Sequence, residues 1–150
     1  MFGPLFPSFF PTIDDLDPSL PAEAVSPALR ALHNKAVVGR MLQSTSYGTE
    51  AELAAWLGIS QEEIAQVRQK RRIPDEWFFR LCFERRISVY WLLSGNGPER
   101  LPFVPPRDSR EGRRLEHTLW FALRLCDEAM SARCAVAAMT RMFPSEGKEG

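Results

Sequence analysis

The chain has 150 residues, enough for one ordinary domain or for a small domain with tails. Its 19 basic and 19 acidic side chains cancel, and 45% of the residues are apolar, which excludes a histone-like basic protein and a wholly disordered acidic one. No apolar run approaches the roughly 20 residues that span a bilayer, so we expect no membrane segment. The cysteines lie in apolar contexts without metal-ligand spacing and are expected to be buried thiols in a reducing cytoplasm: Cys82, Cys126 and Cys134.

The sequence offers little for catalysis. Its two histidines, His33 and His117, are too few for a usual metal site or a convincing triad, and there is no glycine-rich phosphate loop. The carboxylates fall at predicted helix caps and on exposed faces. We therefore expect a protein that is not an enzyme, with no cofactor, no metal and no catalytic residue.

Residues 1–27 are predicted to form an acidic arm, because they hold six of the twelve prolines and no Lys or Arg. Proline fixes φ and lacks an N–H group, so this stretch should resist helix formation. It also lacks the basic segment of a secretory signal. Its four phenylalanines are Phe2, Phe6, Phe9 and Phe10. They either dock on the chain's own core or bind a protein partner.

Residues 28–98 have a helical pattern throughout, with apolar side chains three or four apart and no convincing period of two. After a first helix over 28–46, Thr49-x-x-Glu52 and Ser60-x-x-Glu63 each match a capping box and predict two short helices. Pro74 suits the first turn of a fourth helix, which should run to about Glu84. A fifth helix is expected from Ser88 to Leu93, ended by Gly95. The fold class is therefore all-α.

The two short helices meet the demands of a helix-turn-helix unit. Ala54 supplies a small side chain where the helices cross, and Gly58 supplies a turn residue without a Cβ. A plain structural hairpin would share the periodicity but would need neither residue. Apolar residues occupy the inward positions: Leu53, Leu57, Ile59, Ile64 and Val67.

Residues 49–98 resemble the DNA-binding domain of bacteriophage CI-type repressors. The resemblance includes the Ile73-Pro74 step and the Trp91-Leu92-Leu93-Ser94-Gly95 ending, and it covers roughly residues 30–98. It implies a five-helix, sequence-specific transcriptional repressor that binds operator DNA as a dimer. About 50 residues follow the linker, too few for the self-cleaving peptidase domain that many full-length repressors carry, so we expect no induction by autoproteolysis.

In such a fold the second short helix lies in the major groove of double-stranded DNA. Its outward residues are the candidate base contacts: Ser60, Gln61, Glu62, Ala65, Gln66 and Gln69. A basic cluster follows, made of Arg68, Lys70, Arg71 and Arg72. It is predicted to bind DNA phosphates or, alternatively, to be a solvated helix end with cations at its negative pole. The roles of Lys35 and Arg40, on the first helix, remain open. Because Glu62 and Glu63 repel phosphates, a protein-interaction module with the same fold and no DNA binding remains the alternative.

Residues 99–109 are predicted to be a proline-rich linker, followed by one long helix or two over 110–143. This C-terminal segment has too much apolar surface to remain exposed. It either packs on its own domain or pairs with the same helix of a second chain. Pairing would make a homodimer through four candidate contacts: Leu119, Phe121, Leu123 and Met130. A chain cut after Pro106 would then be a folded monomer.

Overall fold

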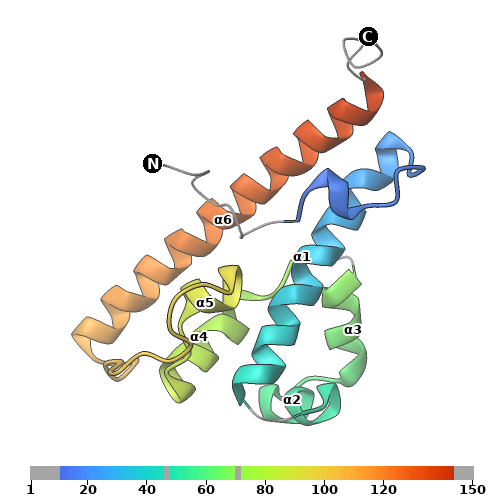
Figure 1. Cartoon of the computed structure of the whole chain (residues 1–150). Coiled ribbons are helices and arrows are strands. Elements are labelled where there is room, and N and C mark those ends of the chain that lie inside the picture. Colours follow the sequence, from blue (N-terminus) through green and yellow to red (C-terminus); the bar gives the residue numbers. More distant parts are fainter. Residues whose placement is uncertain (1–10, 46–47, 70–71, 144–150) are drawn as a thin grey trace.

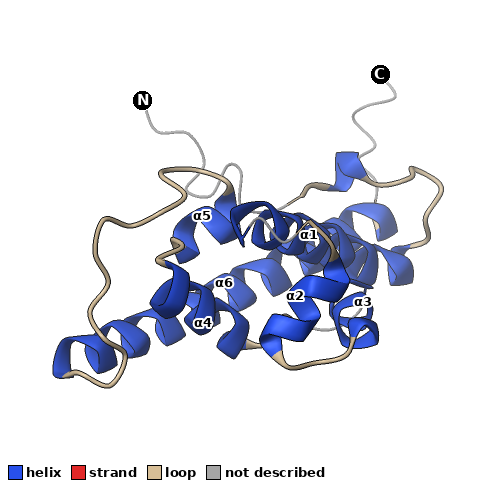
Figure 2. Cartoon of the chain, turned by 90° about the horizontal axis from the view of Figure 1, so that it is seen from below, coloured by secondary structure: helices blue, strands red, loops and turns tan. Residues whose placement is uncertain are grey.

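The computed structural model describes residues 11–45, 48–69 and 72–143 (Figure 1). This part of the chain forms helices joined by loops, without a β-strand, so the predicted all-α fold is confirmed (Figure 2). A short 3-10 helix precedes six α-helices: η1 (Ile13–Asp15), α1 (Ala22–Thr45), α2 (Glu50–Leu57), α3 (Gln61–Gln69), α4 (Asp75–Arg85), α5 (Val89–Ser94) and α6 (Arg110–Met142).

The predicted helix starts are confirmed by their caps. The Thr49 hydroxyl accepts a hydrogen bond from the Glu52 backbone N–H at 3.2 Å. At the start of α3 the Ser60 hydroxyl accepts from the Glu63 N–H at 3.2 Å, while the Glu63 carboxylate accepts from the Ser60 N–H at 3.4 Å. These caps satisfy backbone donors that a helix leaves without an internal partner.

Helix α1 begins at Ala22, before the predicted start at residue 28, and includes Pro27. The prediction of an irregular arm is therefore wrong for residues 22–27. The physical reason is burial: Val25 and Leu29 are fully buried in a cluster with Met130 and Cys134 of α6. That packing offsets the cost of a proline close to the helix start.

Part of the predicted arm also packs on the helices. Ile13 and Leu16 are half-buried against the cluster between α1 and α6. The Arg141 guanidinium, near the end of α6, donates to the backbone oxygens of Pro18 at 2.9 Å and Leu20 at 2.6 Å. This stretch is therefore fixed to the end of α6, whereas the four phenylalanines of the arm lie outside the described residues.

Helix α6 is a single helix that runs along α1 and packs on α4 (Figure 1). Leu123 is buried in the main core, Met130 is buried against α1, and Leu119 is half-buried beside the core. Packing within the chain therefore makes Leu123 and Met130 unavailable to a second chain, which corrects their assignment to a dimer contact. Phe121, by contrast, is exposed.

The segment between α5 and α6 is docked on the domain and does not separate α6 from it. The Ser88 N–H donates to the Glu99 oxygen at 2.9 Å, and the Leu101 N–H donates to the Arg86 oxygen at 2.7 Å. Arg107 then joins two helices, because its guanidinium contacts Glu76 of α4 at 2.7 Å and Glu116 of α6 at 2.8 Å. These contacts hold the start of α6 against α4.

The three cysteines are free thiols, and Cys82 and Cys134 are buried, as predicted. Burial raises the pKa of Cys82 to about 11, so this thiol stays protonated at neutral pH. Across the described ranges, no helix is both long and apolar enough to cross a membrane.

Candidate nucleic-acid interface

The turn between α2 and α3 depends on the left-handed conformation of Gly58, whose φ is +76°. The Gly58 N–H donates to the Ala55 oxygen at 3.2 Å, and the Ile59 N–H donates to the Ala54 oxygen at 3.0 Å. This is the Schellman pattern, which ends α2 and redirects the chain into α3. The turn fixes the angle between the two helices.

Helix α3 is seated on the rest of the domain by one apolar face and one buried polar contact. Ile64 and Val67 are buried in the main core. The buried Asn34 side chain of α1 donates to the Val67 backbone oxygen at 2.8 Å, near the end of α3. Because that carbonyl belongs to the last turn of a helix, the Asn34 amide supplies a partner that the helix itself lacks.

The opposite face of α3 is open to solvent. All six residues predicted to point outward are exposed: Ser60, Gln61, Glu62, Ala65, Gln66 and Gln69. The three glutamines among them carry amides that can donate and accept hydrogen bonds. The orientation predicted for this face is thus confirmed. The contacts of these side chains with bases remain a prediction.

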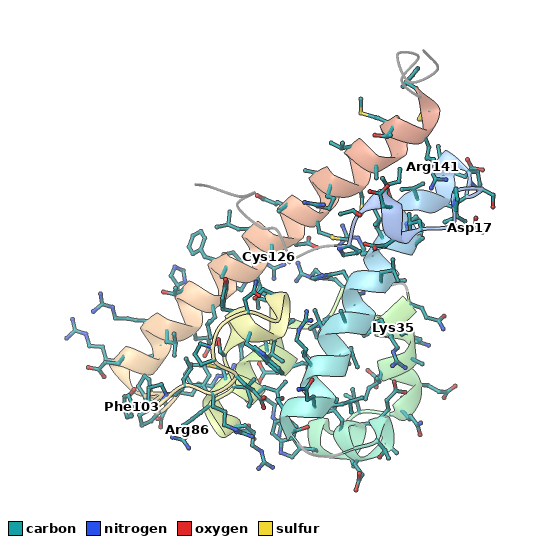
Figure 3. The ribbon with its side chains drawn as sticks, in the orientation of Figure 1. Asp17, Lys35, Arg86, Phe103, Cys126 and Arg141 are labelled. Atoms are coloured by element: carbon teal, nitrogen blue, oxygen red, sulfur yellow. The ribbon has the colours of Figure 1, made fainter. Side chains whose placement is uncertain are left out.

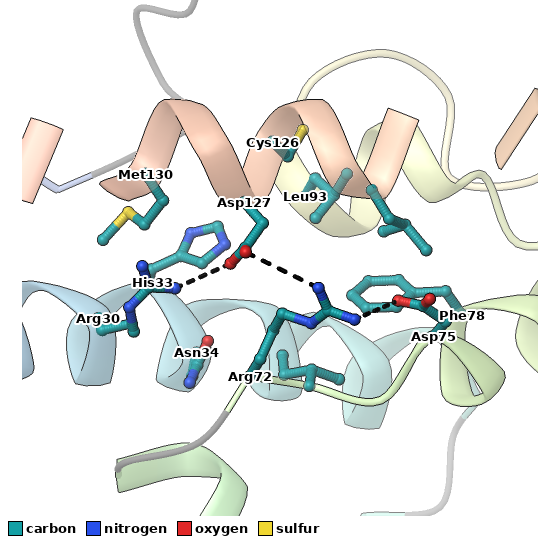
Figure 4. A pocket seen from close by; sticks show the side chains of 12 residues that line it. Arg30, His33, Asn34, Arg72, Asp75, Phe78, Leu93, Cys126, Asp127 and Met130 are labelled. Carbon is teal, nitrogen blue, oxygen red and sulfur yellow. Dashed lines mark hydrogen bonds and ion pairs between the residues drawn. The ribbon is translucent and has the colours of Figure 1, made fainter. Parts of the chain in front are cut away.

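The structure describes two members of the predicted phosphate-binding cluster, and both are engaged within the chain. Arg68 forms an ion pair with Glu50 at the start of α2. Arg72 lies 3.4 Å from a carboxylate oxygen of Asp75 and 3.7 Å from one of Asp127 (Figure 4). Lys70 and Arg71 lie outside the described residues.

Arg72 belongs to a chain of alternating charges that connects the loop after α3 to α6. Asp127 of α6 lies between Arg72 and Arg30, at 3.0 Å from the latter, and Asp75 is also paired with Arg124 at 2.6 Å. Burial raises the pKa of Asp75, Arg72 opposes the rise, and the nearby Asp127 adds to it. A phosphate that bound Arg72 would therefore compete with two carboxylates of the protein itself.

The structure distinguishes the two undecided cations of α1. Arg40 donates to the backbone oxygens of Leu92 at 2.7 Å and Leu93 at 3.2 Å, so it has a structural role at the end of α5. Lys35 lies on the side of α1 that faces α3 (Figure 3) and is exposed. It lines the same surface hollow as Arg68 and Gln69. Lys35 is thus a candidate phosphate contact, which no sequence motif would have identified, because α1 and α3 are brought together by the fold.

The part of the chain that the structure describes holds no group of three or more His, Cys, Asp or Glu side chains placed to bind a metal ion.

Comparison with curated proteins and with solved structures found no match. A protein-family model does match, and it covers the C-terminal part of α1, helices α2 to α5 and the start of the loop after α5. The matched residues include the Gly58 turn, the exposed face of α3 and the Ile73-Pro74 step. Residues 36–100 thus match the family described as the bacteriophage CI repressor helix-turn-helix domain, and the resemblance predicted from the sequence is confirmed.

Proposed function

We propose that this protein is a transcriptional regulator that binds double-stranded DNA by placing α3 in the major groove. The observation that carries the proposal is the exposed amide-rich face of α3 within a matched repressor helix-turn-helix domain. Gln side chains can pair with adenine through two hydrogen bonds, and Ser can contact either donors or acceptors on base edges. The assigned readers are Ser60, Gln61, Glu62, Ala65, Gln66 and Gln69.

Phosphate binding is assigned to a smaller set of cations than the sequence predicts. Lys35 is exposed beside α3, and Lys70 and Arg71 directly follow it in the sequence. Arg68 and Arg72 contribute only if DNA displaces their carboxylate partners. We propose that the resulting modest affinity of one domain is raised by a homodimer that binds two half-sites about 34–36 Å apart.

A binding experiment with matched variants tests the function. A random double-stranded DNA pool is selected with the full chain, and binding to the preferred site is then measured at several salt concentrations. Affinity should fall steeply with salt, because phosphate contacts release counterions. Salt-insensitive binding, or no enrichment of any sequence at low salt, would contradict the proposal.

Single substitutions distinguish residues that contact bases from residues that contact phosphates. Gln61→Ala and Gln66→Ala should each weaken the preferred site by about 1–3 kcal/mol and relax its sequence preference, because a paired base edge loses its partner. Lys35→Ala and Arg71→Ala should weaken all sequences about equally. The same uniform loss for both kinds of variant would refute the assigned reading face.

A protein-interaction module without DNA binding is the second candidate, and the charge of the helix-turn-helix supports it. Residues 49–69 contain four carboxylates and one cation, Arg68, which is already paired with Glu50. A surface of this kind disfavours phosphates. Failure of DNA selection, together with retention of a folded chain, would favour this alternative.

A further inference from the structure

The alternating charges around Arg72 form a row of five side chains from four elements. Arg72, in the loop after α3, lies between Asp127 of α6 and Asp75 of α4 (Figure 4). Each of these carboxylates has a second arginine on its other side, which is Arg30 of α1 for Asp127 and Arg124 of α6 for Asp75. Arg72 is therefore the central member of the row.

Arg72 is also the most weakly held member. Its guanidinium lies 3.4 Å from Asp75 and 3.7 Å from Asp127. Arg124 is closer to Asp75, at 2.6 Å, and Arg30 is closer to Asp127, at 3.0 Å. The Arg72 side chain is 41% exposed, more than any other in the row. If Arg72 moves away, each carboxylate keeps its closer arginine, so no buried or half-buried charge loses its last partner.

Arg68, in the last turn of α3, does not have this freedom. The Glu50 oxygen that faces Arg68 is buried, so separation of the pair would leave that oxygen away from water and without its cation. The two arginines belong to one basic cluster in the sequence, but the fold holds them with different strength. Arg72 is the one that can exchange its partners.

The position of Arg72 is suited to a DNA phosphate. Arg72 is the third residue after Gln69, where α3 ends. Phosphate strands flank the major groove on both sides, so a cation that directly follows a helix in the groove is placed near one of them. A phosphate accepts two parallel hydrogen bonds from a guanidinium, and this contact is stronger than two long, exposed ion pairs.

We propose that Asp127 holds Arg72 against α6 in the free protein and that a backbone phosphate takes Arg72 over when DNA binds. In the bound state Asp127 stays paired with Arg30, and Asp75 stays paired with Arg124. Asp127 thus acts as a positioning residue that lowers the affinity for all DNA sequences alike. The inference rests on the proposed function and extends it to a residue outside the matched residues 36–100.

A double-mutant cycle on the full chain tests the exchange, with binding to a selected duplex and to a scrambled duplex measured by fluorescence anisotropy. Asp127→Asn removes the competing charge and should raise the affinity for both duplexes about two- to fivefold, the range expected for an exposed ion pair. In an Arg72→Ala background the same substitution should change neither affinity. Asp127→Glu keeps the charge and should bind like the wild-type chain.

Glu128→Gln is the matched control, because Glu128 is the next residue of α6, is exposed, and carries the same charge. It should leave the affinity nearly unchanged. The exchange is wrong if Asp127→Asn gives no gain, if Glu128→Gln gives an equal gain, or if the gain persists without Arg72. Each of these outcomes leaves the proposed function intact, whereas absence of DNA binding by the wild-type chain refutes both. Circular dichroism melts establish that each variant is folded.

Side-chain NMR tests the same step on the unaltered sequence. The guanidinium resonance of Arg72, assigned from an Arg72→Lys variant, should shift on addition of the selected duplex. The resonances of Arg30 and Arg124 should stay close to their free positions, because these side chains keep their carboxylates. An Arg72 resonance that does not respond to saturating DNA would overturn the exchange.

Discussion

Several arginine side chains of this protein satisfy backbone carbonyls in loops and at helix ends. Arg40 binds the last carbonyls of α5, and Arg141 binds those of the segment before α1. Arg100 donates to the Ser44 oxygen at 2.8 Å, near the end of α1. A guanidinium offers five donors in a fixed geometry and remains charged, so it can replace water at several carbonyls at once. The guanidiniums of Arg40, Arg100 and Arg141 are therefore engaged within the chain and stabilise its fold.

Gly58 is the single residue on which the helix-turn-helix angle most directly depends. Gly58→Ala should lower the free energy of unfolding by about 1–2 kcal/mol, because a Cβ disfavours the left-handed conformation at φ +76°. Urea unfolding followed by circular dichroism measures the change. Gly39→Ala is the matched control. It lies within α1 with open space around it, and the substitution should stabilise the chain by about 0.5–1 kcal/mol. Equal effects of the two substitutions would contradict this account of the turn.

At the scale of elements, local signals and long-range packing were predictable to different degrees. Thr49, Ser60 and Gly58 act on backbone groups within a few residues, so their spacing alone located α2, α3 and the turn. The start of α1 was missed because its stability comes from α6, more than 100 residues away, through the Val25 and Met130 cluster.

The candidate interface divides in the same way. The outward face of α3 follows from helical periodicity and was correctly predicted. The pairing of Arg68 with Glu50 and of Arg72 with Asp127 depends on which elements the fold brings together. The sequence identifies the cations, but the carboxylates that pair with them are known only once the fold is known.

The ion pairs of Arg107 join α4 to α6 and predict a pH dependence. Hydrogen bonds from Arg107 hold the pKa of Glu76 below its ordinary value of 4.5, although burial opposes the shift. The stabilisation is therefore fully present above pH 4.5 and is lost as the pH falls through the lowered pKa of the folded state. Glu76→Gln should destabilise the neutral protein by less than about 1 kcal/mol, since the carboxylate is largely exposed.

Thermal melts across the acid range measure this dependence. The stability difference between wild type and Glu76→Gln should shrink between pH 5 and pH 3, because protonation removes the same charge that the substitution removes. Asp108→Asn, at an exposed turn residue next to Arg107, provides the control and should not reproduce that trend. A difference that stays constant over this range would show that the Glu76 charge does not stabilise the fold.

At the scale of the whole molecule, α6 is both a wall of the core and a carrier of exposed apolar surface. Its inner face completes the burial of Val25 and Leu29, and Asp127 contacts the loop after α3 through Arg72. Helix α6 therefore supports the helix-turn-helix directly, through α1 and through the loop after α3, with no flexible linker between them.

The last prediction is that a chain ending at Pro106 does not fold cooperatively, contrary to the sequence-based expectation of a folded monomer. Removal of α6 takes Leu123 out of the main core and uncovers Val25 and Leu29, which are fully buried in the intact chain. Each large-to-small core change costs about 2–5 kcal/mol, so losing Leu123 and Met130 together approaches the 5–15 kcal/mol that stabilise a typical domain. The deletion also removes Arg107 and Arg124, the partners of Glu76 and Asp75.

Circular dichroism melting of the truncated chain measures this loss, and a chain ending at Phe143 is the matched control. The control keeps every described contact of α6 and should melt as sharply as the full chain. Leu125→Glu in the full chain is a second control, because Leu125 is 62% exposed and the substitution leaves the inner face of α6 intact. This variant should melt as cooperatively as the wild-type chain. A sharp transition for the chain ending at Pro106 would mean that α1 to α5 form a core without α6, and the burial of Val25 and Leu29 would then be dispensable.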